Sequence, residues 1–114
     1  MLGLKNSVII VTTHKEQQMH TVILRFTCKP DVREGFAKTL PETLSATRAF
    51  DGCKLVEVYL DQDNADVIVL WEKWESRAHQ EKYFAWRVET GLLEALGAVL
   101  AAPAEVWHFD EAGA

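Results

Sequence analysis

The sequence has little of what marks several common classes of protein. Its two cysteines, Cys28 and Cys53, are too few for a disulfide framework and too isolated for a metal knuckle, so we interpret both as structural thiols. Lysine and arginine number 12 against 17 acidic residues, which gives a net charge of −5. Nucleic acids and anionic membranes attract basic surfaces, so we expect neither as a partner. No apolar run approaches the ~20 residues of a membrane-spanning helix.

Recognisable cofactor and nucleophile motifs are also missing. The chain contains no glycine-rich phosphate loop, no GxSxG sequence and no Cys-His signature. Four histidines, His14, His20, His79 and His108, form no i,i+4 pair and have no nearby thiolate partner. His20 and His108 would be neighbours if the first and last strands pair, but two ligands seldom make a metal site. We therefore expect no metal and no cofactor.

The length of 114 residues predicts one domain with a real hydrophobic core. We expect residues 1–18 to form an N-terminal extension and residues 19–114 to form the folded domain. The first residues include a very short apolar stretch and no plausible cleavage site for a secretory signal. The expected location is the cytoplasm, and the expected partner is a small molecule or another protein.

The most informative segment runs from residue 67 to residue 91. Its first part predicts a strand from Val67 to Trp74 that is apolar on both faces, because side chains alternate along a strand. The two faces carry Val67, Val69 and Trp71, and Ile68, Leu70 and Trp74. Helices on one side of a small sheet leave its other face open. We therefore predict that a second copy of the chain covers that face, which would make a homodimer through the sheet.

Further strands are predicted at 20–27, 53–60 and 104–109, and helices from Pro30 to the turn at 50–52, from 76 to 90, and over 92–100. Pro41 falls inside the first helix, where it should cause a kink or a break near Leu40. The order strand, helix, strand, strand, helix, strand is the ferredoxin-like βαββαβ pattern of an α+β fold with an antiparallel sheet. Two such units packed through their sheets would form a dimeric α+β barrel.

The helix at 76–90 carries the best candidates for a binding site. At about 100° per residue, His79, Tyr83, Trp86 and Thr90 share one face. Aromatic bodies with polar tips suit a flat, partly polar ligand. The alternative is that these are core residues whose polar ends reach backbone carbonyls. His79 is the candidate general acid or base, because imidazole titrates near neutral pH.

Three residues on the predicted strands are further candidates for substrate binding. Trp71 and Trp74 lie on opposite faces, so one should point to the pocket and the other to the dimer partner. Both are also explained by packing alone. Arg25 could anchor an anionic group of the substrate, or it could form an ion pair at the surface or the interface.

The sequence Trp74-Glu75-Ser76, followed by the aromatic-rich helix and a leucine-rich segment, resembles the antibiotic biosynthesis monooxygenase (ABM) domain. The turn from Thr47 to Cys53 is also similar to that family, and the resemblance covers roughly residues 19–110. It implies a dimeric ferredoxin-like barrel. The activities of the family include cofactor-independent oxygenation of quinols and anthrones, haem degradation, and isomerisation of small sugar-derived signals.

The haem-degrading branch of the family has an Asn in the first strand, a Trp on the second helix and a His about ten residues later. Trp86 matches the Trp, but the first strand has no Asn, and Leu96 stands where the His is expected. The resemblance thus implies an oxygenase that uses O₂ on an electron-rich aromatic substrate without a cofactor. His79 would be the base, Tyr83 and Trp86 the wall, and Trp74 or Trp71 the floor. The alternatives are a non-catalytic dimeric binding module and an isomerase of a small hydroxy-ketone.

Overall fold

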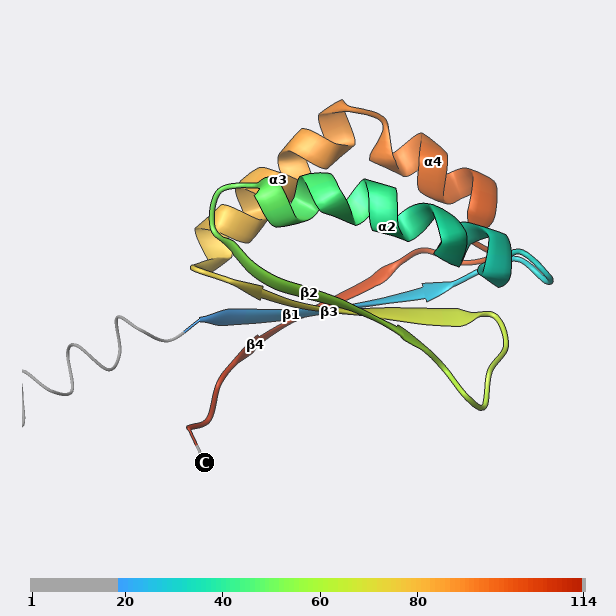
Figure 1. Cartoon of the computed structure of the whole chain (residues 1–114), viewed down its shortest axis with the longest axis horizontal. Helices are drawn as coiled ribbons and strands as arrows, with labels where there is room; N and C mark the ends of the chain where they lie inside the picture. The colour runs from blue at the N-terminus through green and yellow to red at the C-terminus, as the bar shows by residue number, and fades with distance from the viewer. Residues whose placement is uncertain (1–18, 114) are drawn as a thin grey trace, which may run out of the picture.

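The computed structural model describes residues 19–113, in which a four-stranded antiparallel sheet carries all the described helices on one face (Figure 1). The elements are β1 His20–Thr27, α2 Arg33–Ala49, β2 Cys53–Leu60, β3 Val67–Trp74, α3 Arg77–Glu89, α4 Leu92–Val99 and β4 Glu105–Asp110. The predicted extension at 1–18 lies outside the described residues. No helix in the described part of the chain combines the length and the apolar character that crossing a membrane requires.

The strand order is β2-β3-β1-β4, so the first strand in the sequence lies between the third and the last. β1 pairs antiparallel with β3 from His20 opposite Trp74 to Thr27 opposite Val67. On its other side it pairs with β4, from His20 opposite Asp110 to Arg25 opposite Glu105. The ferredoxin-like α+β prediction is confirmed, and the predicted bounds of the first three strands agree with the structure.

The core lies between the sheet and the helices. Alternate residues of β1 and β3 supply it, and Leu24 stands directly opposite Leu70. The helices contribute Leu40 and Leu44 of α2 and Tyr83 of α3 to the same cluster. Burial of such side chains is the main favourable term in folding, and here it fixes which side of each strand faces the helices.

Helix α2 continues through Pro41, and the break predicted at this position does not occur. The proline removes one helical hydrogen bond at a cost of ~3 kcal/mol. Leu40 and Leu44 are buried on either side of it, and Thr47 is buried one turn further on. This buried stripe holds both halves of the helix against the sheet and offsets the cost.

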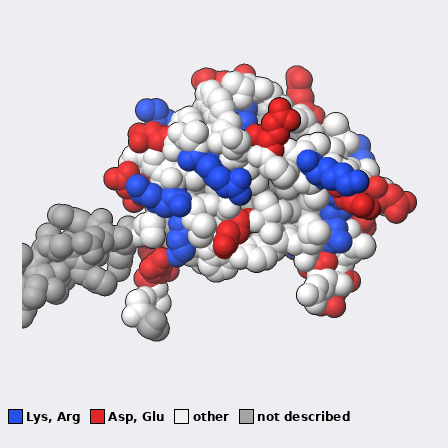
Figure 2. Space-filling model, in the orientation of Figure 1, with Lys and Arg blue, Asp and Glu red and all other residues white. Residues whose placement is uncertain are grey.

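None of the described helices covers the other face of the sheet, which we call the uncovered face (Figure 1). This face is rich in apolar side chains. The register places Trp71 and Trp107 on either side of Ile23, in one row across β3, β1 and β4. The exposed apolar residues of this face are Leu55, Tyr59, Trp71, Trp107 and Phe109, with exposed fractions between 36% and 50%. Charged side chains of both signs are interspersed over the side of the molecule that Figure 2 shows.

The position of Leu44 in the core predicts a large effect of its truncation on stability. Leu44→Ala should lower the free energy of unfolding by about 2–5 kcal/mol, because it leaves a cavity beneath α2. Leu93→Ala is the matched control, since Leu93 is 61% exposed, and it should change stability by less than ~1 kcal/mol. Urea denaturation followed by circular dichroism measures both, and equal losses would show that the core is elsewhere.

Candidate functional site

A cavity of about 550 Å³ lies between α3, α4 and the side of the sheet that faces the helices. Its walls are mostly apolar: Leu24 and Phe26 come from β1, Val106 from β4 and Phe84 from α3. Helix α4 and the segment after it form the remaining wall. A mostly apolar pocket of this size with a few polar groups is the usual form of a small-molecule site.

The distinctive polar group of the cavity is the carboxyl of Glu72, which is only 3% exposed. The indole Nε1 of Trp74 donates to its Oε1 at 2.9 Å. Its second oxygen has no hydrogen-bond partner within residues 19–113. Burial raises the pKa of Glu72, while the bond from Trp74 and the positive charge of Arg87 act in the opposite direction.

Glu72 occupies the cavity because of the register of β3. It belongs to the row of Ile68, Leu70 and Trp74, which faces the helices. In the sheet it stands between Val22 of β1 and Val56 of β2. A carboxyl in such a row costs stability, and such costs are typical of functional sites.

Gln80 is the second polar group of the wall, and it is also 3% exposed. It lies in the first turn of α3, where its backbone amide bonds the carbonyl of Ser76 at 3.3 Å. No residue of the described chain forms a hydrogen bond with its side-chain amide. A buried amide without a protein partner can donate to and accept from a bound molecule.

Tyr83 lines the same cavity with its ring, while its hydroxyl belongs to a network behind the wall. The hydroxyl lies 2.6 Å from Thr47 Oγ1 and accepts from Arg87 Nε at 2.7 Å. The guanidinium of Arg87 also lies 4.8 Å from the ring centre of Trp86. These contacts join α2 to α3 and fix the position of the tyrosine ring.

The other predicted substrate-binding residues lie outside the lining of this cavity. Trp74 points towards the helices, is fully buried and reaches the site through Glu72. Trp86 packs against Phe50, with ring centres 5.5 Å apart. Trp71 lies on the uncovered face, where Arg25 forms an ion pair with Glu105 at 3.1 Å. Arg25 was predicted either to anchor an anionic group of the substrate or to form an ion pair, and the structure has the ion pair.

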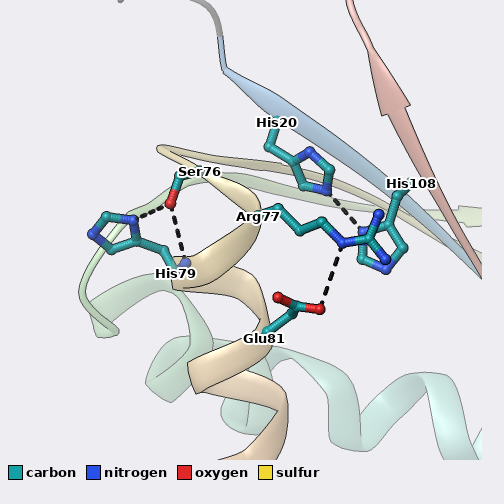
Figure 3. Close-up of polar contacts among 6 residues, drawn as sticks. All are labelled: His20, Ser76, Arg77, His79, Glu81 and His108. Atoms are coloured by element: carbon teal, nitrogen blue, oxygen red, sulfur yellow. Dashed lines mark hydrogen bonds and ion pairs between the residues drawn. The ribbon is translucent and has the colours of Figure 1, made fainter.

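His79, the predicted base, lies at the start of α3 (Figure 3). It is not one of the residues that line the cavity. Its Nδ1 is 2.6 Å from the hydroxyl of Ser76, the N-cap residue of α3. Its ring also packs against the turn before β2: a Cβ added to Gly52 would lie 2.4 Å from it. His79 therefore joins this turn to the helix start. The cavity contacts the helix face of Gln80, Tyr83 and Phe84, which is rotated from the face predicted from the sequence.

A pair of histidines, His20 and His108, lies on the opposite side of the start of α3 from His79 (Figure 3). His20 Nε2 and His108 Nδ1 are 2.8 Å apart, because β1 pairs with β4. Burial lowers the pKa of both imidazoles, and the charge of Arg77 lowers both further. The negative charge of Glu81 acts in the opposite direction on both, as that of Asp110 does on His20.

His108 of this pair lines a smaller cavity of about 360 Å³, which shares Gln80, Phe84 and Val106 with the main one. No group of three or more potential metal ligands occurs among residues 19–113.

Glu72 and Gln80 are the functional candidates that the sequence analysis missed. A single acidic residue in the apolar row of a buried strand was a usable signal for Glu72. It was overlooked because the tryptophans on either side of it dominate the pattern. Gln80 carries no such signal, since a glutamine in the first turn of a helix is usually exposed.

The family model for antibiotic biosynthesis monooxygenases matches residues 19–101. Rv0793 of Mycobacterium tuberculosis, a provisionally assigned monooxygenase, is 32% identical over 78 residues, which are 63% of this chain and 76% of the relative. Its solved structure superposes with a TM-score of 0.62 at 29% identity, over 83% of this chain and 99% of that one.

Two further crystal structures share the fold. One is of an antibiotic biosynthesis monooxygenase, with a TM-score of 0.71 and 24% identity over 82% of this chain and 98% of that one. The other is NE2512 of Nitrosomonas europaea, a protein of unknown function, with a TM-score of 0.74 and 13% identity over 87% and 94% of the two chains. At these identities the likeness concerns the fold alone.

The histidine pair predicts that stability falls as the pH is lowered through about 6.5, the ordinary value for histidine. The pKa of both imidazoles is lowered in the folded chain. Just below pH 6.5 the two histidines therefore bind more protons in the unfolded chain than in the folded one, and this difference favours unfolding. Urea denaturation at pH 7.5 and pH 5.5 measures the loss. The double variant His20→Asn/His108→Asn should lose less stability over this range, and an unchanged loss would contradict the prediction.

Proposed function

This chain belongs to the antibiotic biosynthesis monooxygenase family, and from this membership and its cavity we propose that it is a cofactor-independent monooxygenase. The substrate is an electron-rich aromatic molecule of the quinol or anthrone type, and the oxidant is O₂. The observation that carries the proposal is the Glu72 carboxyl, buried in the wall of an otherwise apolar cavity.

The proposed reaction begins when the Glu72 carboxylate removes a proton from the substrate. Burial raises the pKa of Glu72, which makes the carboxylate a stronger base than an exposed one. The apolar walls exclude water, so the substrate anion is held in a site where it can meet O₂.

Electron transfer from the substrate anion to O₂ gives a radical pair, which combines to a peroxide at the ring carbon. The O–O bond then breaks, and the ring carbon loses its remaining hydrogen as it becomes a carbonyl. Glu72 returns its proton to the departing oxygen, which leaves as water. One oxygen atom thus enters the product, and the other carries away two hydrogens of the substrate.

Neighbouring side chains have supporting roles in this proposal. The side-chain amide of Gln80 orients the substrate oxygen, and the ring of Tyr83 forms part of the wall. Trp74 is a positioning residue, because it holds Glu72 through its indole N–H. The catalytic role predicted for His79 stays a prediction, and its place outside the lining favours Glu72 as the base.

Two other functions would use the same cavity. A non-catalytic binding module would hold the ligand without changing it. An isomerase of a small hydroxy-ketone would use Glu72 to move a proton between carbons and would not consume oxygen. Oxygen uptake therefore distinguishes the proposed function from both.

Replacing the base should remove turnover. Glu72→Gln should lower kcat by about 10²–10⁴-fold, because it keeps the shape of the side chain and loses its basicity. The assay is oxygen uptake by chelator-treated protein with a panel of quinols and anthrones, with product mass recorded. The control is Glu89→Gln, since Glu89 is an exposed residue of α3. His79→Gln should keep its turnover; loss of turnover in this variant and not in Glu72→Gln would identify His79 as the base.

The proposal includes a homodimer in which a second copy covers the uncovered face. An exposed apolar patch that spans β2, β3, β1 and β4 is typical of an interface. Two copies related by a two-fold axis would bring the Trp71 and Trp107 rows together. The ion pair of Arg25 and Glu105 lies on the same face.

A charge in the middle of this patch should prevent dimerisation. Trp71→Glu should convert a dimer to a monomer in sedimentation velocity at micromolar concentration, because the carboxylate would be buried without a partner. Val88→Glu is the control: Val88 lies on α3, and its exposed fraction of 38% equals that of Trp71. A monomeric natural chain, or a dimer that Trp71→Glu leaves intact, would contradict this part of the proposal.

A further inference from the structure

Helix α4 is almost entirely apolar in sequence, yet it has no buried residue. Its eight residues read LLEALGAV, and Leu93 is 61% exposed. An apolar helix in a small domain normally buries one side against the core. The inner side of α4 touches the core through Leu96, but much of it borders open space.

That space consists of two cavities, one on each side of the helix. The first is the main cavity with Glu72. The second, of about 570 Å³, lies between α4 and α2. The two share Phe26 of β1 and Leu92 and Leu96 of α4 as lining residues. A thin wall of apolar side chains is therefore what separates them.

Both ends of α4 are held by backbone contacts, and the helix lies between the two cavities. At its start, Gly91 adopts a positive φ of 101° and bonds the carbonyl of Val88 at the end of α3. At its end, Leu100 forms a β-bridge with Cys28, and the amide of Lys29 bonds the carbonyl of Val99 at 2.9 Å. Figure 1 shows α4 beside α2, above the sheet.

The two cavities differ in chemistry. The main cavity has Glu72 and Gln80 in its wall. In the second, the hydroxyls of Thr39 and Thr43 donate to helix carbonyls at 2.7 and 3.2 Å, and Asp31 is exposed in the turn before α2. The rest of its lining is glycine and apolar side chains. The main cavity suits a polar ring, and the second suits a hydrocarbon.

We propose that the second cavity binds a flexible apolar chain of the substrate whose aromatic ring occupies the main cavity. The substrate class is then a quinol-type ring with an alkyl chain of several carbons. The chain passes under α4, where the side chains of Leu92 and Leu96 turn aside. A saturated chain can bend around these leucines by rotation about its bonds, whereas a rigid polycycle cannot. The identity of the ring rests on the proposed function, whereas the binding of an apolar chain in the second cavity does not depend on it.

Two glycines allow each cavity to be filled separately. Gly35 lines the second cavity and Gly97 the main one. A Cβ at either position would have no heavy atom within 4 Å. Both lie within helices, where replacing glycine is favourable in itself. Leucine at position 35 or 97 should thus fill one cavity and leave the fold intact.

The probes are 1,4-naphthoquinone and its 2-butyl and 2-octyl derivatives, with binding measured by calorimetry in the absence of turnover. In the natural chain, Kd should fall by about two- to fourfold for each added methylene, the range expected for burial of a CH₂ group. Gly35→Leu should abolish this gain and leave the bare ring unaffected. Gly97→Leu should weaken all three probes. Ala46→Leu on α2 and Ala98→Leu on α4 are the matched controls. Both residues are exposed and line neither cavity, so these variants should bind as the natural chain does.

The proposal is overturned if Kd does not depend on chain length, or if the gain is the same in Gly35→Leu as in the natural chain. Anthraquinone, which is rigid, should bind equally to the natural chain and to Gly35→Leu, and a loss with this variant would also overturn it. Failure of the proposed function is a separate result: a chain-length gain that Gly35→Leu removes, without oxygen uptake on any quinol, would support the second cavity and reject the monooxygenase.

Discussion

Burial of the Glu72 carboxyl is the constraint on which the rest of the site depends. A carboxyl in an apolar row is tolerated because the indole of Trp74 donates to it, and the indole must itself be held in place. Tyr83 packs against Trp74 with ring centres 5.0 Å apart, and Arg87 and Thr47 hold Tyr83 through its hydroxyl. The acid thus stands at the end of a supported series of contacts from α2 and α3. Rigid support of this kind is what a positioned base requires.

Strand β3 serves two different surfaces with one short sequence. Its residues facing the helices build the core and the cavity wall, and the alternate residues build the uncovered face. A change at Trp74 therefore affects the site, whereas a change at Trp71 affects the uncovered face. This division explains why the strand is apolar on both sides and yet carries a single acid towards the helices. It also separates experiments on chemistry from experiments on assembly.

The sequence was sufficient for the architecture, because alternation along strands and turn residues between them are local signals. It was less informative about the site, which depends on how each helix is rotated on the sheet. Residues spaced by three or four in α3 define several overlapping helix faces. The aromatic face that includes His79 gives a stronger sequence pattern than the face that includes Gln80, although the cavity contacts the second face. The position of His79 against Gly52 is a contact between a turn and a helix that no spacing rule contains. The break predicted at Pro41 is absent for a similar reason, since the buried leucines around it act only in the folded chain.

The central position of β1 bears on how the chain folds as it is made. The first strand is synthesised early, but it lies between two strands that come later, and its partner in β4 is the last element of the domain. The imidazoles of His20 and His108, which meet across this pairing, are 88 positions apart in the chain. Pairing over such a separation requires closure of a long loop, which slows folding. One edge of β1 thus stays open until β4 has left the ribosome, and during that time this edge is available to any other strand it meets.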